Sequence, residues 1–339
     1  MKILIIQTAF YGDLILTLPM VQVIKKTHPD YKVDYICIPK TSDILKNNIN
    51  VNEVIIYDKN GVDKGFSGFM KLKNKIKGNK YDVIICVQRF LRTTLLSYLG
   101  GPELTIGFDN AFLSGLYDKK VNYQTKHEIL RNLDLLKPIG IEINEIIRPE
   151  LFPGESDIHE VDRIFSGLNL KKDQKVICVA PGSVWFTKRF PAVKYAALFD
   201  KLDNQDYLIL LIGDKNDLRD CEQIQSMSTN NNIYNYAGKL TIMQSAELIK
   251  RSSLLLTNDS APLHIANSVS TDVIAFFGST IREFGFYPYG KHDFVFEVDG
   301  LECRPCTNHG KDYCKIKILD CMNKISEKII SEKITEMLS

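Results

Sequence analysis

The sequence lacks any long apolar segment. After Lys2, the first apolar run covers only Ile3 to Ile6 and stops at Gln7, so the apolar region of roughly 7–15 residues that a secretory signal peptide needs is missing. No run approaches the ~20 residues that a transmembrane helix requires. We therefore expect a cytoplasmic protein that contacts a membrane only at its surface.

The chain also has little net charge and no framework of paired cysteines. Its 43 Lys and Arg residues nearly balance its 41 Asp and Glu residues, for a net charge of +2, whereas nucleic-acid-binding domains are normally more basic. Cys37, Cys86 and Cys178 lie in or beside apolar runs, as buried thiols do in a reducing compartment. We expect no nucleic-acid partner and no disulfide framework.

Four cysteines near the C-terminus have a spacing that two interpretations fit. Cys303, Cys306, Cys314 and Cys321 form the pattern C-x2-C-x7-C-x6-C. Four thiolates that include one C-x2-C pair could hold a tetrahedral Zn²⁺. The second pair, Cys314 and Cys321, lacks the close spacing that is usual in zinc sites, which favours four free thiols that bind no metal. Both interpretations stay open at this point.

Length and pattern predict two α/β domains. A chain of 339 residues is long enough for two domains that each bury a core. Short apolar runs alternate with polar or helical segments, which favours parallel sheets covered by helices. The expected strands are 2–7, 33–38, 53–57, 82–87, 104–108, 176–180, 207–212, 233–236, 254–256 and 273–277.

The alternation weakens between Pro138 and Pro153, where we place the domain boundary. The expected division is 1–150, 151–320 and a C-terminal segment, 321–339, that contains an amphipathic helix. The expected helices are 12–27, 126–137, 191–202, 241–250 and 322–338.

The most informative stretch is Ser253 to Thr280. A strand, a helix and a second strand in fewer than 30 residues form a βαβ unit, so the two strands should be parallel neighbours. The helix begins near Asp259, Ser260 and Pro262, at the carboxyl end of the first strand. Its amides and dipole favour an anion such as a diphosphate. Alternatively, Asp259 or Ser260 only caps the helix, and His264, farther along it, is an interior histidine.

Three other loops follow expected strands. In the first, Gly12 permits tight backbone geometry and Asp13 lies at a helix start, where it could also be a simple cap. The second, 180–189, follows Pro181-Gly182 with hydroxyls and two cations, which suits a diphosphate. The third, 213–217, carries an acid that could hold a ribose hydroxyl or cap the next helix.

A lysine-rich segment runs from Lys59 to Lys80, with seven lysines against one acid, Asp63. The favoured interpretation is a solvated helix face. The functional alternative is an electropositive surface for an acidic ligand.

Three segments together resemble glycosyltransferase family 9, the lipopolysaccharide heptosyltransferases, over nearly the whole chain. They are Tyr11-Gly12-Asp13, then Pro181-Gly182-Ser183 with Thr187-Lys188-Arg189-Phe190-Pro191, and finally Asn258-Asp259-Ser260-Ala261-Pro262-Leu263-His264 with Phe277-Gly278-Ser279-Thr280. Ala261 stands where the family usually has glycine. The cysteine-bearing tail is similar to that of heptosyltransferase II-like members.

The resemblance implies a GT-B fold, in which two Rossmann-like domains with parallel sheets face a central cleft. The N-terminal domain would bind the acceptor, the C-terminal domain the nucleotide sugar, and the last helix would pack back on the N-terminal domain. The implied donor is ADP-L-glycero-D-manno-heptose, and the acceptor is the lipid A-Kdo/heptose inner core at the inner leaflet of the inner membrane. Transfer would invert the anomeric carbon and need neither a metal nor a cofactor.

The resemblance also assigns residues. Asp13 would be the base that takes the acceptor proton, and Lys188 with the helix start would offset charge on the leaving ADP. Leu240 would pack on adenine, Asp217 would hold the ribose, and His264 would support the helix-start loop. The full set of implied donor contacts is Ser183, Thr187, Lys188, Gly213, Asp217, Leu240, Asp259, Ser260, Ala261 and His264; the acceptor contacts are Gly12, Lys64, Arg89 and Arg92.

Two alternatives come from other functional classes. Another GT-B enzyme, with a different sugar donor or acting as a sugar-nucleotide epimerase, would share the nucleotide site. A non-catalytic module that binds nucleotide sugars would share it too, although Asp13 on the acceptor side argues against that.

Overall fold

The computed structural model describes residues 1–203 and 205–339. Within these residues the chain divides into two compact units, Met1–Phe152 and Pro153–Ser339, two residues beyond the expected boundary. Each unit contains one six-stranded sheet, and the recorded strand pairs are parallel. The predicted α/β class with two parallel sheets is confirmed.

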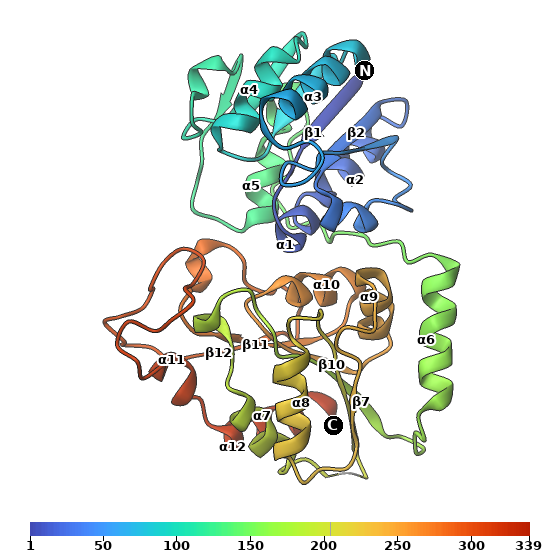
Figure 1. Cartoon of the computed structure of the whole chain (residues 1–339), viewed down its shortest axis with the longest axis vertical. Helices are drawn as coiled ribbons and strands as arrows, with labels where there is room; N and C mark the ends of the chain where they lie inside the picture. The colour runs from blue at the N-terminus through green and yellow to red at the C-terminus, as the bar shows by residue number, and fades with distance from the viewer. Residues whose placement is uncertain (204) are drawn as a thin grey trace. The chain divides into compact units, whose positions relative to one another are not determined.

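The N-terminal unit has the strand order β3-β2-β1-β4-β5-β6 (Figure 1). Ile3 to Ile6 in the central strand β1 are fully buried, because both faces of a parallel sheet are covered. The strands are β1 (Lys2–Ile6), β2 (Lys32–Cys37), β3 (Glu53–Ile56), β4 (Val83–Cys86), β5 (Leu104–Phe108) and β6 (Lys119–Val121). The helices are α1 (Tyr11–Ile15), α2 (Leu18–Thr27), α3 (Gly65–Asn79), α4 (Leu91–Leu99) and α5 (Glu128–Asp134).

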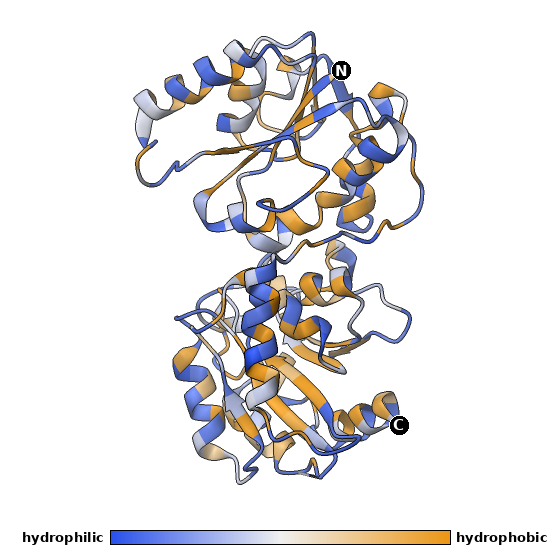
Figure 2. Cartoon of the chain, turned by 90° about the vertical axis from the view of Figure 1, so that its right-hand side faces the viewer, coloured by the Kyte–Doolittle hydropathy of each residue, from blue (hydrophilic) through white to orange (hydrophobic). Residues whose placement is uncertain are grey.

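The C-terminal unit has the order β12-β11-β10-β7-β8-β9, and Figure 2 shows its strands as mainly hydrophobic. The strands are β7 (Lys175–Ala180), β8 (Tyr207–Leu211), β9 (Ile233–Asn235), β10 (Leu254–Asn258), β11 (Val273–Phe277) and β12 (Phe294–Glu297). The helices are α6 (Glu155–Gly167), α7 (Ala192–Phe199), α8 (Leu218–Met227), α9 (Ile242–Lys250), α10 (Ala261–Val269), α11 (Asp320–Asn323) and α12 (Glu327–Leu338).

Both sheets have the same topology. When the strands of each unit are counted from its own start, each order becomes 3-2-1-4-5-6, the arrangement of doubly wound dinucleotide-binding folds. The strand order reverses between β1 and β4 in one unit and between β7 and β10 in the other. Ligands bind such sheets beyond the carboxyl ends of the strands at this reversal. The topology therefore indicates that the loops after these four strands are the candidate ligand-binding loops.

The βαβ unit predicted for Ser253 to Thr280 is confirmed. Strands β10 and β11 are parallel neighbours, with Leu255 opposite Val273, and α10 lies between them in sequence. Consequently, the start of α10 lies next to the strand-order reversal.

The C-terminal segment differs from the expectation. The helix predicted for 322–338 is two helices, α11 and α12. Ile330 and Ile334 of α12 are fully buried in the core of the C-terminal unit, and Lys194 of α7 pairs with Glu327 at 2.7 Å. The apolar stripe of α12 is therefore covered by its own unit, and the expected packing of segment 321–339 on the N-terminal domain stays a prediction.

Other boundaries differ by a few residues. The helix predicted for 12–27 is divided into α1 and α2 at Leu16 and Thr17, where the Thr17 hydroxyl donates to the Leu14 carbonyl at 2.6 Å. The short edge strands β6 and β12 were not predicted. Among the described residues, no helix is both long and apolar enough to span a bilayer.

Candidate functional site

The start of α10 is organised by a buried carboxylate. Asp259 is 7% exposed and follows β10, at the strand-order reversal. Its Oδ2 atom lies 2.6 Å from the Lys188 ammonium nitrogen and accepts a hydrogen bond of 2.6 Å from the Thr280 hydroxyl. Lys188 also donates to the Asp259 carbonyl at 3.2 Å. A cation is thus fixed beside the N-terminus of a nine-residue helix.

This arrangement argues against the capping interpretation of Asp259 and Ser260. Ser260 occupies the N-cap position with extended backbone, yet its side chain makes no capping hydrogen bond within the described structure. Its hydroxyl instead lies 3.4 Å from the Thr257 hydroxyl and from the Asn258 carbonyl. Since Asp259 is directed to Lys188 and Thr280, neither side chain competes with an anion for the first amides of α10.

Asn258 fastens the neighbouring loop to the end of β10. Its Nδ2 atom donates to the Pro181 and Gly182 carbonyls at 2.7 and 3.2 Å, and its Oδ1 accepts from the Phe190 amide at 2.9 Å. The side chain is fully buried, so these bonds form away from competing water. They hold the two ends of the 181–190 loop, which carries Lys188, against the strand that leads to Asp259.

Thr187 ties the same loop to two further segments. Its hydroxyl lies 3.0 Å from the Ser279 hydroxyl, and the Lys311 amide donates to it at 2.8 Å. The Thr187 amide in turn donates to the Lys311 carbonyl at 3.0 Å. Ser183 contributes its carbonyl, which accepts from Arg189 Nε at 2.8 Å. The structure thus brings Thr187, Lys188 and Asp259 together, as expected for one site.

Asp217 fits into space that two glycines leave open. A Cβ atom on Gly182 would lie 2.0 Å from Asp217 Oδ1, and one on Gly213 would lie 2.6 Å from Asp217 Cβ. Asp217 Oδ2 accepts from the Asp214 amide at 2.9 Å. Burial raises the pKa of Asp217; the hydrogen bond from the Asp214 amide opposes the rise, and the charge of Asp214 adds to it. Residue 217 therefore lies between the loops after β7 and β8, and its predicted ribose contact stays a prediction.

Three predicted donor residues have weaker support. Leu240 is half-buried just before α9, and Ala261 is the first residue of α10. His264 is 4% exposed and lies 6.3 Å from the Phe286 ring, centroid to centroid. The contacts described for His264 suit an interior residue on the second turn of α10. Its predicted support of the loop stays a prediction.

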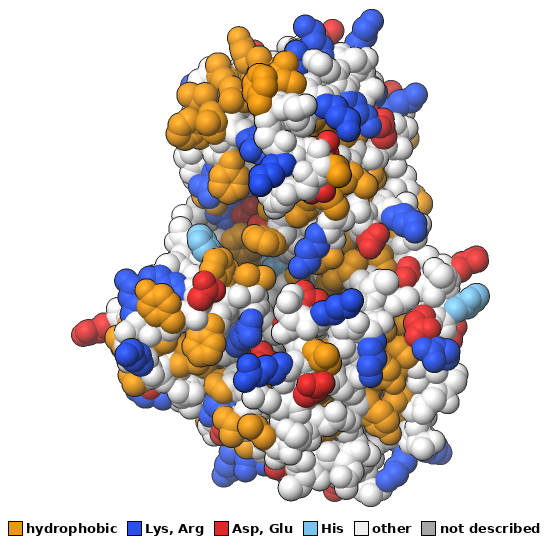
Figure 3. Space-filling model, viewed as in Figure 1, with side chains coloured by type: hydrophobic (Ala, Val, Ile, Leu, Met, Phe, Trp, Pro, Cys, Tyr) orange, Lys and Arg blue, Asp and Glu red, His pale blue; other side chains and the backbone are white. Residues whose placement is uncertain are grey.

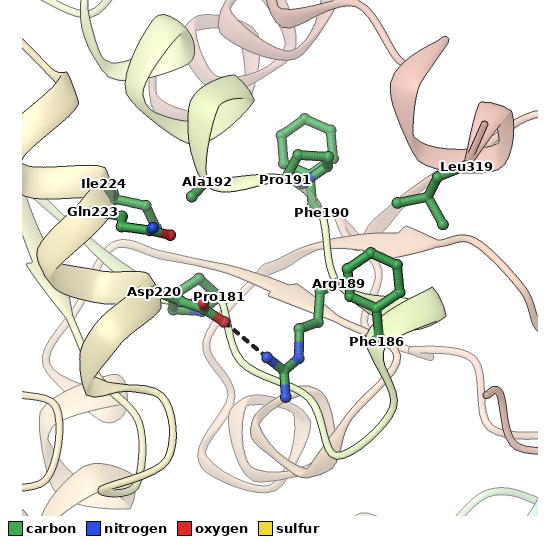
Figure 4. A pocket seen from close by; sticks show the side chains of 10 residues that line it. All are labelled: Pro181, Phe186, Arg189, Phe190, Pro191, Ala192, Asp220, Gln223, Ile224 and Leu319. Atoms are coloured by element: carbon green, nitrogen blue, oxygen red, sulfur yellow. Dashed lines mark hydrogen bonds and ion pairs between the residues drawn. The ribbon is translucent and has the colours of Figure 1, made fainter. Parts of the chain in front are cut away.

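A separate pocket lies behind the 181–190 loop (Figure 4). It has a volume of about 230 Å³, and the ion pair between Arg189 and Asp220, 3.0 Å apart, crosses its edge. The predicted donor residues are not among those that line it, which are Pro181, Phe186, Arg189, Phe190, Pro191, Ala192, Asp220, Gln223, Ile224 and Leu319. We therefore do not place the donor there.

In the N-terminal unit, Asp13 lies at the third position of α1. Its Oδ2 accepts from the Phe10 amide at 3.3 Å, so it contributes to helix capping without being the N-cap residue. Gly12 precedes it, and its carbonyl accepts the Leu16 amide at 3.0 Å. The structure places Asp13 at the carboxyl end of β1, beside the strand-order reversal of this sheet.

Three residues to which the sequence assigned no role join the strand ends near Asp13. The Thr8 hydroxyl and amide both donate to Gln88 Oε1, at 2.6 and 2.9 Å, which links the loops after β1 and β4. Lys59 donates to the Thr8 carbonyl at 2.8 Å. Burial lowers the pKa of Lys59, and the charge of Arg92 lowers it further. Position after strand ends was the one signal that could have identified Thr8 and Gln88.

The predicted acceptor cations have different recorded partners. Arg89 is exposed, with its guanidinium carbon 4.2 Å from the centre of the Tyr123 ring. Arg92 donates to the Tyr57 hydroxyl at 3.4 Å, and Lys64 is the exposed N-cap residue of α3. Their predicted acceptor contacts stay predictions.

The four C-terminal cysteines are thiols without a disulfide. Burial raises the pKa of Cys321 to about 11. Burial alone would raise the pKa of Cys314 too, but amides of residues 316–319 donate to its sulfur and lower it. Among the described residues, no group of three or more His, Cys, Asp or Glu side chains is arranged to hold a metal ion.

Comparisons with known proteins agree with the fold. Lipopolysaccharide heptosyltransferase 3 of Escherichia coli is 28% identical over 283 residues, covering 80% of this chain and 82% of the relative. A family 9 glycosyltransferase structure from Veillonella parvula DSM 2008 superposes with a TM-score of 0.88 at 23% identity, covering 99% and 97% of the two chains. The E. coli ADP-heptose lps heptosyltransferase II structure gives 0.80 at 20% identity, covering 100% and 98%. These structures support the two-domain GT-B fold.

The family itself is shown by a match to its family model. Residues 69–317 match glycosyltransferase family 9 (heptosyltransferase), which covers most of the chain and includes the Lys188, Asp259 and Thr280 cluster. The chain therefore belongs to glycosyltransferase family 9.

Proposed function

We propose that the protein transfers heptose from ADP-L-glycero-D-manno-heptose to the inner core of lipopolysaccharide, with inversion at the anomeric carbon. The main observation in support is the Lys188–Asp259 ion pair at the start of α10. The side chain of the N-cap residue makes no capping hydrogen bond there, so the first amides of the helix can bind a ligand. This arrangement suits a diphosphate. The acceptor class comes from the relatives, which are heptosyltransferases of lipopolysaccharide.

The donor half neutralises charge on the leaving group. Lys188 has three N–H donors, and in the described structure Asp259 accepts from two of them, through its carboxylate and its carbonyl. The Lys188 ammonium group and the free amides of α10 lie at the same end of the helix. As the bond between the anomeric carbon and the phosphate oxygen breaks, its electron pair passes to that oxygen, and these groups stabilise the charge that develops.

The acceptor half supplies the base. The acceptor hydroxyl oxygen forms the new bond to the anomeric carbon from the face opposite ADP, and its proton passes to the Asp13 carboxylate. The hydrogen bond from the Phe10 amide fixes the orientation of that carboxylate. Attack opposite the leaving group inverts the configuration.

The N-terminal unit also carries features suited to the inner leaflet of the inner membrane. Phe90 and Phe112 are 66% and 59% exposed, and the Phe112 amide donates to the Arg89 carbonyl at 3.0 Å, so these segments are adjacent. Hydrophobic side chains gather over α4 in Figure 3. Leu91 and Leu113 extend this apolar patch. Exposed aromatics beside arginines suit an anionic lipid surface.

The first prediction concerns Lys188. Lys188→Ala should weaken binding of ADP-heptose roughly 10- to 100-fold, since a hydrogen bond to a charged group contributes about 1.5–3 kcal/mol. Isothermal titration calorimetry measures this. Lys194→Ala is the matched control, because Lys194 forms a similarly buried pair with Glu327 at 2.7 Å but lies outside the site. Both variants should lose stability, and an unchanged affinity in folded Lys188→Ala would refute the phosphate assignment.

The second prediction concerns Asp13. Asp13→Asn should reduce kcat by about 10²–10⁴-fold, because an amide cannot accept the proton, while donor affinity and melting temperature barely change. Asp157→Asn is the control, since Asp157 also accepts the N-cap amide of its helix, from Gly154 at 3.0 Å. Near wild-type turnover by Asp13→Asn at saturating acceptor would show that another group is the base.

The third prediction tests the reaction and its independence of metals. With ADP-heptose and a core acceptor, mass spectrometry should show the acceptor gaining one heptose as ADP is released, at equal rates with and without EDTA. Lys188 and the helix amides supply the positive charge that a metal would otherwise bring. Loss of transfer in EDTA that Mg²⁺ or Mn²⁺ restores would contradict metal independence. An altered sugar nucleotide without acceptor would indicate an epimerase instead.

The fourth prediction concerns the membrane. The double variant Phe90→Ser and Phe112→Ser should bind vesicles that contain anionic phospholipid about tenfold or more weakly, since each buried phenylalanine contributes up to about 1.5–3 kcal/mol. Sedimentation with vesicles measures this, and activity on a lipid-free acceptor should be unchanged. Tyr313→Ser is the control, because Tyr313 is 64% exposed in the other unit. Equal binding by wild type and double variant would remove the patch from membrane attachment.

A further inference from the structure

A second carboxylate, Glu128, lies within electrostatic reach of Asp13 and is not used in the proposed reaction. Glu128 is the first residue of α5, and its side chain is 14% exposed. Its Oε2 atom lies 2.8 Å from an Arg131 guanidinium nitrogen. The Arg131 side chain is only 5% exposed, so the pair is held within the unit, where charges interact more strongly than in water.

The helix that carries Glu128 is fixed to the helix that carries Asp13. Asn132 Nδ2 donates to the Leu16 carbonyl at 3.1 Å, and Leu16 is the C-cap residue of α1. Glu128 lies four residues before Asn132, so the two side chains share one face of α5. Asp13 lies three residues before Leu16, about one helical turn away. The bond between Asn132 and Leu16 therefore holds the helix that carries Glu128 next to the helix that carries Asp13, and the charge of Asp13 acts on Glu128.

Arg131 is itself held by Tyr123. Its guanidinium donates to the Tyr123 hydroxyl at 2.6 Å and lies 4.6 Å from the centre of that ring, where a cation is attracted to the aromatic face. Arg89 lies 4.2 Å from the same ring centre. The geometry of the Glu128–Arg131 pair is thus set by a second element, the segment before α5.

We propose, on the basis of the proposed function, that Glu128 is a positioning residue whose charge, held by Arg131, offsets that cation beside the base Asp13. Without the glutamate charge, Arg131 would act on Asp13 as an unbalanced cation. A carboxylate beside such a cation holds its proton less tightly and is a weaker base. Glu128 therefore keeps Asp13 effective as a proton acceptor.

The electrostatics of Glu128 agree with this placement. Burial raises the pKa of Glu128, Arg131 opposes the rise, and the negative charge of Asp13 adds to it. Since such an interaction is mutual, the charge of Glu128 acts on Asp13 in turn. The charge of Asp13 also acts on Tyr35 and Tyr123. Arg89 and Arg131 act on both Tyr123 and Glu128, and Lys40 lies above the ring of Tyr11, two residues before Asp13.

The fifth prediction is the pH profile of Glu128→Gln. The acid limb of kcat/KM, where Asp13 loses its proton, should move to lower pH by about one unit, the low end of what an unbalanced neighbouring cation produces. The plateau should also fall, because the base is weaker. Replacing both partners, with Glu128→Gln and Arg131→Gln, should return the limb toward its wild-type position.

The matched control is Glu247→Gln. Glu247 is also a buried glutamate paired with an arginine, Arg251, at 2.7 Å, but it lies in the C-terminal unit, on α9. It should lose stability and leave the acid limb in place. An unmoved limb in folded Glu128→Gln would overturn the proposal and leave Glu128 as a structural residue. Should that variant not fold, Arg131→Gln leaves the charge of Glu128 without its cation, so the acid limb should move to higher pH, and an unmoved limb in Arg131→Gln would overturn the proposal equally.

The experiments distinguish a failure of the proposed base, Asp13, from a failure of the proposed role of Glu128. Near wild-type activity in Asp13→Asn would remove the base and the role of Glu128 with it. Loss of activity in Asp13→Asn together with an unmoved limb in Glu128→Gln would overturn only the role of Glu128.

Discussion

The ion pair between Lys188 and Asp259 is the interaction on which the C-terminal site depends. It joins the loop after β7 to the loop after β10, and the Thr280 hydroxyl adds the loop after β11. Three adjacent strands of the sheet are thereby tied at their carboxyl ends. Breaking one side of a buried pair costs about 3–5 kcal/mol, so organisation of the site and stability of the unit are coupled.

The N-terminal unit uses the same strand order with different chemistry. There, the loops at the reversal are joined by the bonds from Thr8 to the neutral side chain of Gln88, and Lys59 donates to a carbonyl. The charged group near the helix start is the carboxylate of Asp13. One strand order therefore carries a lysine–carboxylate pair at a helix start in one unit and the carboxylate of Asp13 in the other, because the loops after the strands differ.

The sequence was sufficient for the parallel strands, since buried strands of both sheets are continuous apolar runs between polar segments. It failed where local signals are weak or concern tertiary contacts. Strands β6 and β12 are only three and four residues long. The stripe of Ile330 and Ile334 shows that α12 has a buried face, but not which unit covers it.

The site shows the same division between local and tertiary information. Lys188, Asp259 and Asp13 were predicted because they lie in recognisable segments after strands. Thr280, Gln88 and Glu128 were assigned no individual role, because hydrophobic periodicity does not identify their partners. Thr280 donates to Asp259, 21 residues away, and Gln88 accepts from Thr8, 80 residues away. Glu128 pairs with Arg131, three residues away. The helix that carries Glu128 is linked to the helix that carries Asp13 by the hydrogen bond from Asn132 to Leu16, and these two residues are 116 positions apart in the sequence.

Asp13 and Asp259 look alike in sequence, since each is an acid near a helix start, but their hydrogen-bond and ion-pair partners differ. Asp259 accepts from Thr280 and pairs with Lys188, leaving the helix amides to a ligand. Asp13 accepts the Phe10 amide, so it does contribute to capping. A carboxylate has two oxygens with about four acceptor positions, so one bond from an amide fixes its orientation and leaves other positions open to a proton. Helix capping and the proposed role as base are therefore compatible at Asp13, because the bond from the Phe10 amide would also orient the carboxylate.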